Sequence, residues 1–292
     1  MKDPDQIIFY EAILEKNLNR TVTVREYSSI GGGCIHQAMK VMTGHGIYFI
    51  KSNRLEDADM FKKEFLGLKV LKNASELTIP DPLGFGTHDQ KSYLITEFIE
   101  SGARGVDFWE RFGTGLARLH RNHADRFGFD QDNYIGRLPQ RNDYYDSWVD
   151  FFIEMRLEVQ LKIAFDRQRV DSTFLKRFRK FLSYLPGLLP EEPPSLLHGD
   201  LWSGNFMTGP GGYAVLIDPA VYNGHREIEM SFTRLFGGFD RIFYESYQNE
   251  YPLEPGFDNR VDIYNVYPNL VHLNLFGNSY LGGVERVISL FV

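Results

Sequence analysis

The pattern of apolar and polar positions changes along the chain. In the first third, helical spacing alternates with strand-like segments, and glycines at 31–33 and at 44 and 46 mark turns between strands. The predicted elements there are a helix at 4–18, strands within 21–51 (the second at about 35–42 and the third at 47–51), a helix at 57–73 and a strand at about 92–98. This part predicts a small sheet accompanied by helices.

From about residue 103 onward the pattern is mostly helical. The predicted elements are helices at 106–123, 143–166 and 172–185, a short apolar strand at 214–217, and further helices within 226–292. A proline-rich loop leads into His198–Gly199–Asp200, and the short strand ends at Asp218. A small sheet-rich half thus precedes a larger helical half, and we expect the joint near residues 97–101.

Composition narrows the class of protein. The 292 residues are 43% hydrophobic, which is ample for a core, and the formal net charge of -7 makes nucleic acid a poor partner. One cysteine, Cys34, allows no intrachain disulfide. The charged N-terminal stretch does not resemble a signal peptide, and no apolar run approaches the length of a membrane span. We therefore expect a soluble cytoplasmic protein.

Candidate chemistry begins with Asp200 and Asn205, which are five residues apart on one predicted loop. Phosphoryl transfer requires a carboxylate to receive the proton of the acceptor hydroxyl, and oxygen ligands for Mg²⁺. A carboxylate and an amide at this spacing supply both. Asp218 follows at the end of an apolar strand, where a second metal-binding carboxylate is expected.

The first half offers a complementary set. Lys51 ends a predicted strand, and Glu64 lies on the helix that follows. A lysine that binds ATP phosphates needs an acidic partner to fix its long side chain. The glycines Gly31, Gly32 and Gly33 allow a backbone to approach phosphates closely.

Each of these features alone is usually structural: a glycine turn, a surface ion pair, a turn-forming aspartate. Their order along the chain is hard to obtain by chance. It resembles the order in the protein-kinase-like superfamily. The resemblance implies an α+β, bilobal fold with a small antiparallel-sheet, nucleotide-binding N-lobe at 1–98 and a larger, mostly helical, catalytic and substrate-binding C-lobe at 99–292.

The same motifs indicate which branch of the protein-kinase-like superfamily the chain resembles. Gly199 stands where eukaryotic protein kinases usually carry arginine, and Pro219–Ala220 stands after Asp218 in place of Phe-Gly. These departures argue against a protein substrate. The His-Gly-Asp form resembles aminoglycoside phosphotransferases and choline kinases, although aminoglycoside enzymes typically have His-Pro at the position of Trp202–Ser203.

A closer resemblance is to the fructosamine kinase (ketosamine kinase) family. It rests on LLHGDLWSGN and IDPAVYNGHREIEMSFTRLFGGF, supported by GGGCIHQA, YFIK and LVHLNLFG. The family implies phosphorylation by ATP, with Mg²⁺, of a sugar hydroxyl of a ketosamine, a sugar joined to an amine by glycation. Phosphorylation at the 3-position makes the adduct unstable and releases the amine.

The resemblance also implies residue roles. Asp200 is the expected base, and Asn205 and Asp218 are the expected Mg²⁺ ligands. Lys51 is expected to hold the phosphates and Glu64 to orient Lys51. The nucleotide-binding residues are completed by the phosphate loop at Gly31, Gly32, Gly33 and Cys34, and by the adenine-binding backbone of Glu97, Phe98 and Ile99.

Secondary candidates lie near these motifs. Trp202 is interpreted as a flat wall against which a sugar ring stacks, rather than as a core tryptophan. His225 and Glu227 either contact substrate or brace the loop, and His198 is expected to anchor the catalytic loop. Cys34 is by default a small buried thiol; in the phosphate loop it is a hypothetical redox switch, since oxidation there would distort the loop.

Alternatives remain open at this stage. The chain could phosphorylate an aminoglycoside, a choline-like amine or a free sugar, and a polycationic substrate would call for a strongly acidic pocket. A catalytically inactive nucleotide-binding regulator or a purely structural protein are further classes, which the presence of Lys51, Asp200, Asn205 and Asp218 disfavours. The sequence leaves open which ketosamine is used, which hydroxyl is phosphorylated, and whether the protein is a monomer or a homodimer.

Overall fold

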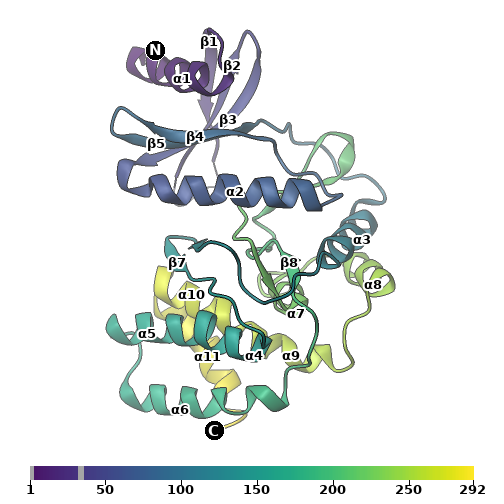
Figure 1. The fold of residues 1–292 in the computed structure, drawn as a ribbon. Coiled ribbons are helices and arrows are strands. Elements are labelled where there is room, and N and C mark those ends of the chain that lie inside the picture. Colours follow the sequence, from purple (N-terminus) through teal and green to yellow (C-terminus); the bar gives the residue numbers. More distant parts are fainter. Residues whose placement is uncertain (1–2, 32–35) are drawn as a thin grey trace. The chain divides into compact units, whose positions relative to one another are not determined.

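A computed structural model describes residues 3–31 and 36–292. The chain divides into two compact units (Figure 1). The sheet unit spans 1–108 and 207–218, and the helical unit spans 109–206 and 219–292. This division differs from the predicted boundary between residues 98 and 99, because the strand pair that ends at Asp218 belongs with the sheet unit. Among the described residues, no helix is long and apolar enough to cross a membrane.

The sheet unit is built on a five-stranded antiparallel sheet in the order β1-β2-β3-β5-β4. Its strands are β1 Val24–Ser29, β2 Gln37–Thr43, β3 Gly46–Arg54, β4 Pro82–His88 and β5 Lys91–Glu97. Its helices are α1 Pro4–Leu18, α2 Ala58–Ala74 and the short 3₁₀ turn η1 Leu55–Asp57. The sequence pattern missed β4, where Gly84 and Gly86 interrupt the apolar alternation.

The helices α1 and α2 lie on opposite sides of this sheet (Figure 1). Ile50 packs in the same buried cluster as Ile13 and Leu14 of α1. Its neighbour Lys51 bonds to Glu64 of α2. Successive strand side chains point to opposite faces. The single-residue step from Ile50 to Lys51 therefore separates a position in the apolar core from one that forms an ion pair with α2.

A second pair of strands completes the sheet unit. β9 Phe206–Thr208 pairs with β10 Ala214–Leu216 around the 3₁₀ turn η4 Pro210–Gly212. Val215 makes a parallel bridge to Thr78, and the Leu216 N–H donates to the Thr78 carbonyl. These bonds fix the strand that leads to Asp218 onto the segment after α2.

The helical unit contains the remaining elements. Its first helix is α3 Phe108–His120, followed by β6 Asn133–Ile135, β7 Leu138–Gln140, α4 Trp148–Phe151, a π-helical segment Phe152–Leu157, α5 Glu158–Asp166, α6 Ser172–Leu182 and η3 Leu185–Gly187. Then come β8 Ser195–Leu197, β11 Tyr222–Gly224, α7 Arg226–Phe232, α8 Arg241–Glu250, α9 Phe257–Tyr264, α10 Val266–Phe276, η5 Asn278–Tyr280 and α11 Leu281–Ile288.

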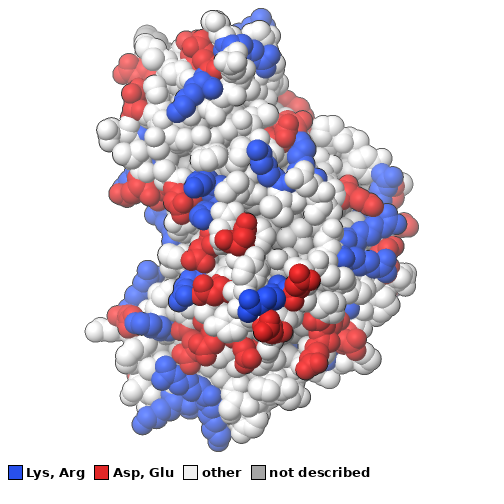
Figure 2. Space-filling view, viewed as in Figure 1, with Lys and Arg blue, Asp and Glu red and all other residues white. Residues whose placement is uncertain are grey.

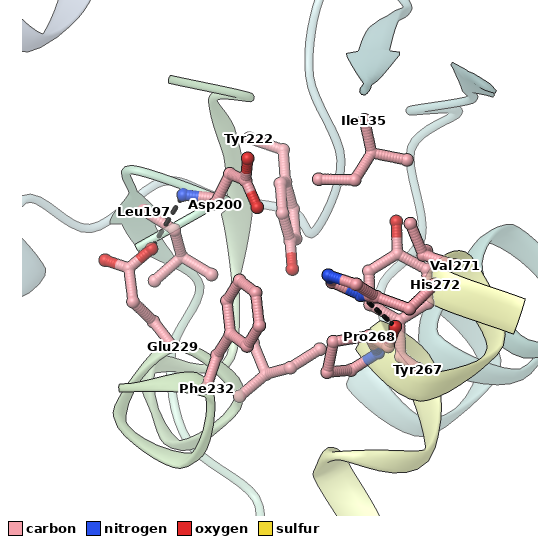
Figure 3. A pocket seen from close by; sticks show the side chains of 12 residues that line it. Ile135, Leu197, Asp200, Tyr222, Glu229, Phe232, Tyr267, Pro268, Val271 and His272 are labelled. Carbon is pink, nitrogen blue, oxygen red and sulfur yellow. Dashed lines mark hydrogen bonds between the residues drawn. The ribbon is translucent and has the colours of Figure 1, made fainter. Parts of the chain in front are cut away.

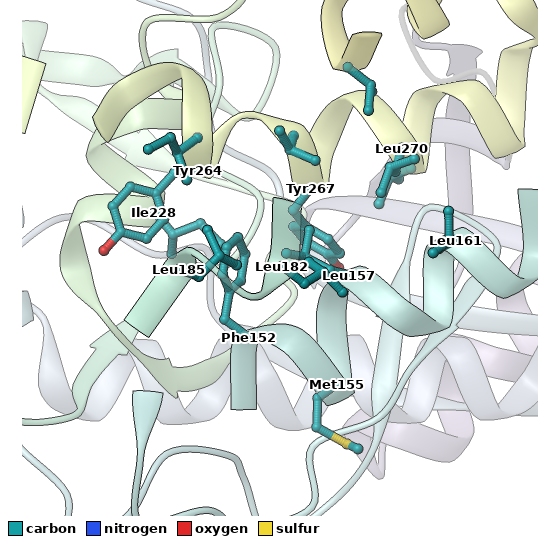
Figure 4. Packing of buried hydrophobic residues seen from close by; sticks show 14 of the residues in the cluster. Phe152, Met155, Leu157, Leu161, Leu182, Leu185, Ile228, Tyr264, Tyr267 and Leu270 are labelled. Atoms are coloured by element: carbon teal, nitrogen blue, oxygen red, sulfur yellow. The ribbon is translucent and has the colours of Figure 1, made fainter. Parts of the chain in front are cut away.

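The core of this unit joins helices that are distant in sequence. Figure 4 shows side chains of α9 and α10 meeting those of the π-helical segment and α5, for example Tyr264 against Phe152, whose ring centroids are 5.7 Å apart. The helix predicted at 143–166 begins only at Trp148. The Ser147 hydroxyl caps it by accepting from the Asp150 N–H.

Charged side chains of both signs are interspersed over the face drawn in Figure 2, with a gathering of Lys and Arg over α6. The net charge is -7.

Candidate active site

Lys51 lies at the centre of a buried ionic cluster in the sheet unit. Its Nζ is 2.7 Å from Glu64 Oε1 and 2.6 Å from Asp218 Oδ1. Lys51 is only 7% exposed, whereas the Asp218 side chain is 45% exposed. The structure therefore brings Lys51 together with Glu64, which is 13 residues away in sequence, and with Asp218, which is 167 residues away.

The cluster is electrostatically coupled. Burial alone would lower the pKa of the Lys51 ammonium, but Asp218 and Glu64 outweigh burial and raise that pKa well above its usual value. Burial raises the pKa of the Glu64 carboxyl, and the nearby Asp218 adds to this while Lys51 opposes it. Lys51 is thus a permanent cation with a fixed position. Such a group is suited to neutralising phosphate charge.

Asp218 reaches this cluster through an uncommon backbone conformation. It follows the β9–β10 pair and has a φ of 56°, in the left-handed region, which aspartate tolerates better than most residues. The half-exposed carboxylate contacts Lys51 on one side and retains access to solvent. It can therefore also bind a cation supplied with a ligand.

The loop at 199–205 of the helical unit, where catalysis is expected, holds Asp200 and Asn205 side by side. Asn205 Nδ2 donates to Asp200 Oδ2 and to the Asp200 carbonyl, each at 2.8 Å. The Asn205 N–H donates to the Trp202 carbonyl, which closes the turn. The amide nitrogen thereby fixes the Asp200 carboxylate. The amide oxygen is left as the atom of Asn205 that suits a hard metal ion.

Gly199 and Glu229 set the path of this loop. Gly199 has a φ of 85°, and a Cβ there would overlap the Ala220 carbonyl oxygen, so glycine is required. Glu229 of α7 accepts from the backbone N–H of Gly199 at 2.6 Å and of His198 at 3.2 Å. His120 Nε2 donates to the same carboxylate at 2.9 Å.

Glu229 is a residue that the sequence reasoning missed. Burial alone would raise the pKa of its carboxyl, but the bonds from His120 and from the backbone of Gly199 outweigh burial and lower it. The carboxylate is therefore ionised and accepts from three donors. Only its position on a helix soon after the expected metal aspartate could have drawn attention to it. His198, as expected, anchors the loop, since its Nδ1 accepts from the Asp200 N–H at 3.3 Å.

Trp202 lies on the surface of the same loop and is partly exposed. Its ring covers the place where a Cβ of Gly204 would stand, and it meets Phe236 edge-on with ring centroids 5.8 Å apart. Its role as a wall for a sugar ring stays a prediction.

His225 and Glu227 do not suit the predicted role in substrate contact. Both are fully buried. His225 caps α7, because its Nδ1 accepts from the Glu227 N–H, and Glu227 accepts from Arg260 Nε at 2.7 Å. The bracing alternative fits these contacts, because they hold α7 in place.

The expected adenine-binding and phosphate-binding segments are only partly described. Glu97 ends β5 and its N–H donates to the Asp81 carbonyl. The Phe98 ring lies under the Lys40 ammonium at 4.3 Å, and Ile99 follows it. A Cβ at Gly31 would meet no atom of the described residues within 4 Å. Gly32, Gly33 and Cys34 lie outside the described residues.

A small pocket with a cavity volume of about 30 Å³ adjoins Asp200 within the helical unit (Figure 3). Apolar and aromatic side chains make up most of its lining. They include Ile135, Tyr222, Phe232, Tyr267, Pro268 and Val271. Its acidic members are Asp200 and Glu229, and Glu229 is already engaged by His120 and the loop backbone.

Comparison with known proteins identifies the family. Residues 9–292 match the family described as fructosamine kinase. This chain belongs to the fructosamine kinase family. It is 39% identical over 272 residues to a probable ketoamine kinase of Synechocystis, covering 91% of this chain and 90% of the relative. It is 35% identical over 275 residues to a chloroplastic protein-ribulosamine 3-kinase of Arabidopsis thaliana, covering 92% and 83%.

Solved structures agree with this assignment. A putative fructosamine-3-kinase from Haemophilus somnus superposes with a TM-score of 0.88 at 25% identity, covering 97% of this chain and 96% of the other. An aminoglycoside phosphotransferase superposes with a TM-score of 0.61 at 17% identity, covering 96% and 97%. The expected α+β, protein-kinase-like fold of this fructosamine kinase family member is confirmed.

Proposed function

We propose that this protein transfers the γ-phosphoryl group of ATP to a sugar hydroxyl of ketosamines such as ribulosamine or fructosamine. One observation carries the proposal: Lys51 is fixed between Glu64 and Asp218 in a chain that also fixes Asp200 against Asn205. Phosphoryl transfer consists mostly of positioning and charge neutralisation, and these two arrangements supply both. The names of the relatives, ketoamine kinase and protein-ribulosamine 3-kinase, support ketosamines as acceptors.

The nucleotide is assigned to the sheet unit. Lys51 neutralises phosphate oxygens, Glu64 keeps the ammonium in place, and the backbone of Glu97, Phe98 and Ile99 holds adenine. Asp218 and Asn205 are the proposed Mg²⁺ ligands. The described residues contain no group of three or more carboxylate, imidazole or thiolate side chains that could hold a metal. Such a sparse donor set fits Mg²⁺, which commonly binds through one or two carboxylates together with substrate phosphates. When bound, the ion would neutralise charge on those phosphates.

Asp200 orients the acceptor hydroxyl and receives its proton. Asn205 donates one hydrogen bond to the Asp200 carboxylate and one to the Asp200 carbonyl, which fixes the direction of the carboxylate before substrate arrives, so little reorganisation accompanies the reaction. We propose the 3-hydroxyl as the acceptor, as in the name of the plant relative. The cytoplasmic location and the choice between monomer and homodimer stay predictions.

The pocket beside Asp200 favours this acceptor over an aminoglycoside. A polycationic drug calls for several unpaired carboxylates, whereas the lining here is mostly apolar and one of its two acidic residues is already bonded. The sugar of a ketosamine presents hydroxyls and apolar C–H faces, and the latter stack on aromatic rings.

A phosphate-transfer assay tests the proposal. The protein, ATP and Mg²⁺ are incubated with synthetic ribulosamine, fructosamine, erythrulosamine, kanamycin and choline, and the phosphorylated position of each product is mapped. We expect transfer to at least one ketosamine at the 3-hydroxyl, followed by release of the amine. Turnover of kanamycin or choline without turnover of any ketosamine would overturn it.

A further inference from the structure

A chain of aromatic rings leads from the catalytic loop to the surface of the helical unit. Trp202 meets Phe236 at 5.8 Å between centroids, and Phe236 meets His272 at 4.8 Å. His272 in turn meets Phe276 at 5.4 Å and Tyr280 at 5.0 Å. We call these five residues the aromatic strip. Their contacts are continuous, so the strip forms one surface.

The aromatic strip begins next to Asp200 and ends at the exposed Phe276. Trp202 is two residues after Asp200, and His272 lines the pocket beside Asp200 (Figure 3). His272 and Phe276 lie one turn apart on α10, so they share a face of that helix. Phe276 is 56% exposed. An exposed aromatic residue continuous with a catalytic pocket indicates a binding surface more strongly than an isolated one does.

The strip carries no formal charge. His272 Nδ1 donates to the Pro268 carbonyl at 2.7 Å, which assigns the proton to that nitrogen. Burial lowers the pKa of the His272 imidazole, so the ring is neutral at physiological pH. The other members are Trp, Phe and Tyr. A strip of this composition binds apolar and aromatic groups by stacking, and it attracts a single ammonium group to its ring faces.

We propose that the aromatic strip binds the amine-bearing portion of the acceptor and gives this kinase a preference for ketosamines of aromatic or bulky apolar amines. The proposal rests on the proposed function. A ketosamine that presents its sugar hydroxyl to Asp200 must direct the rest of the molecule away from the loop. The strip is the aromatic surface that begins at that point. With the sugar ring on Trp202, the secondary ammonium of the ketosamine would lie on Phe236 and His272, and the amine's side chain on Phe276 and Tyr280.

Two acceptors that differ only in the amine test the inference: ribulosyl-glycine and ribulosyl-phenylalanine. For the wild type we expect a KM for the phenylalanine adduct that is roughly three- to tenfold lower, with kcat unchanged, as one or two ring contacts would give. In Phe276→Ala we expect the KM for ribulosyl-phenylalanine to rise until it is close to the KM for ribulosyl-glycine, which should not change. Because the ring of Phe276 is more than half exposed, the variant should fold, and its thermal unfolding checks this.

Phe165→Ala is the matched control, since Phe165 is 41% exposed on α5 and is not a member of the strip. It should keep the preference of the wild type. Equal KM values for the two adducts in the wild type, or an equal loss of preference in Phe165→Ala, would overturn the inference while leaving the kinase activity intact. Failure of the wild type to phosphorylate either adduct would instead remove the proposed function, and the inference with it.

Discussion

Lys51 and Asp200 are held by different kinds of interaction. In the sheet unit, Lys51 is fixed by ion pairs with Glu64 and Asp218. In the helical unit, Asp200 is fixed by the neutral amide of Asn205, and its loop is anchored through the backbone by Glu229.

These two kinds of interaction give the two clusters different freedom to rearrange. An ion pair whose acidic member is half exposed can exchange partners, which suits the proposed roles of Asp218 toward Mg²⁺ and of Lys51 toward phosphate. The loop of Asp200 is held by hydrogen bonds between backbone N–H groups and the buried Glu229 carboxylate, so its rearrangement would cost considerable free energy. Such a loop suits a side chain that must be positioned before substrate binds. Substitutions in the two clusters should therefore affect different steps.

The largest effect is expected from Asp200→Asn. The amide keeps the shape of the side chain but cannot accept the proton of the hydroxyl. We expect kcat to fall by roughly a thousandfold or more, as for loss of a general base, while the KM for ATP stays near the wild-type value. Steady-state kinetics with ribulosamine measure both. Near-full turnover would remove Asp200 from the mechanism.

Lys51→Met should act mainly on the nucleotide. It removes the cation and leaves Glu64 near Asp218, so two carboxylates lose their shared partner. We expect kcat/KM for ATP to fall by roughly a hundredfold and the unfolding temperature to drop, because a buried carboxylate is left unpaired. Glu64→Gln, which keeps the cation, should show a smaller loss of kcat/KM. If it shows the larger loss, the assignment of Lys51 is wrong.

Glu229→Gln tests the anchor of the catalytic loop. Glutamine has one acceptor oxygen and would point an NH₂ group at a backbone N–H or at His120. A misplaced loop should lower kcat by roughly ten- to a hundredfold with little change in the KM for ATP. Glu227→Gln is the matched control, since this buried carboxylate of the same helix binds Arg260. An equal loss of kcat in the control would mean that general destabilisation of α7 causes the effect.

The smallest effect on activity, but a distinct one on stability, is expected from His225→Asn. Burial first, and then the nearby Arg226, lower the pKa of His225 to about 3. As the pH falls through about 6.5, His225 of the unfolded chain binds a proton, whereas the buried His225 of the folded protein stays neutral. The contribution of His225 to the free energy of unfolding is therefore fully present above this pH and decreases below it. By pH 5 the cost from this residue is about 1–2 kcal/mol.

Asparagine retains the cap of α7 without titrating. The difference in unfolding free energy between pH 7 and pH 5 should therefore be smaller in His225→Asn than in the wild type. An equal difference in both proteins would contradict the pKa of His225.

The sequence predicted the order of the elements better than their limits. Helix α1 and strand β3 were expected because their apolar spacing is regular, whereas β4 was missed because its glycines break the pattern. The convergence of Lys51 with Glu64 and Asp218 was expected from family motifs, which encode positions that no local pattern shows.

Other site features depend on tertiary contacts. Glu229 acts through backbone N–H groups 30 and 31 residues away, and nothing in its neighbours in sequence indicates this. For His225 and Glu227 the sequence left substrate contact and bracing open, for the converse reason. They follow the expected metal-binding Asp218 closely in sequence, but His225 caps α7, Glu227 belongs to it, and both side chains are buried.

The affinity of three proteins for MgATP is the sharpest test of whether Lys51 binds the nucleotide while Asp200 acts only on the acceptor. Calorimetric titration of the wild type, Asp200→Asn and Lys51→Met needs no acceptor and no turnover. We expect the Kd of Asp200→Asn to stay within about twofold of the wild type and that of Lys51→Met to rise by about tenfold or more, as loss of one charged hydrogen bond implies. An equal weakening in both variants, or none in Lys51→Met, would contradict the account.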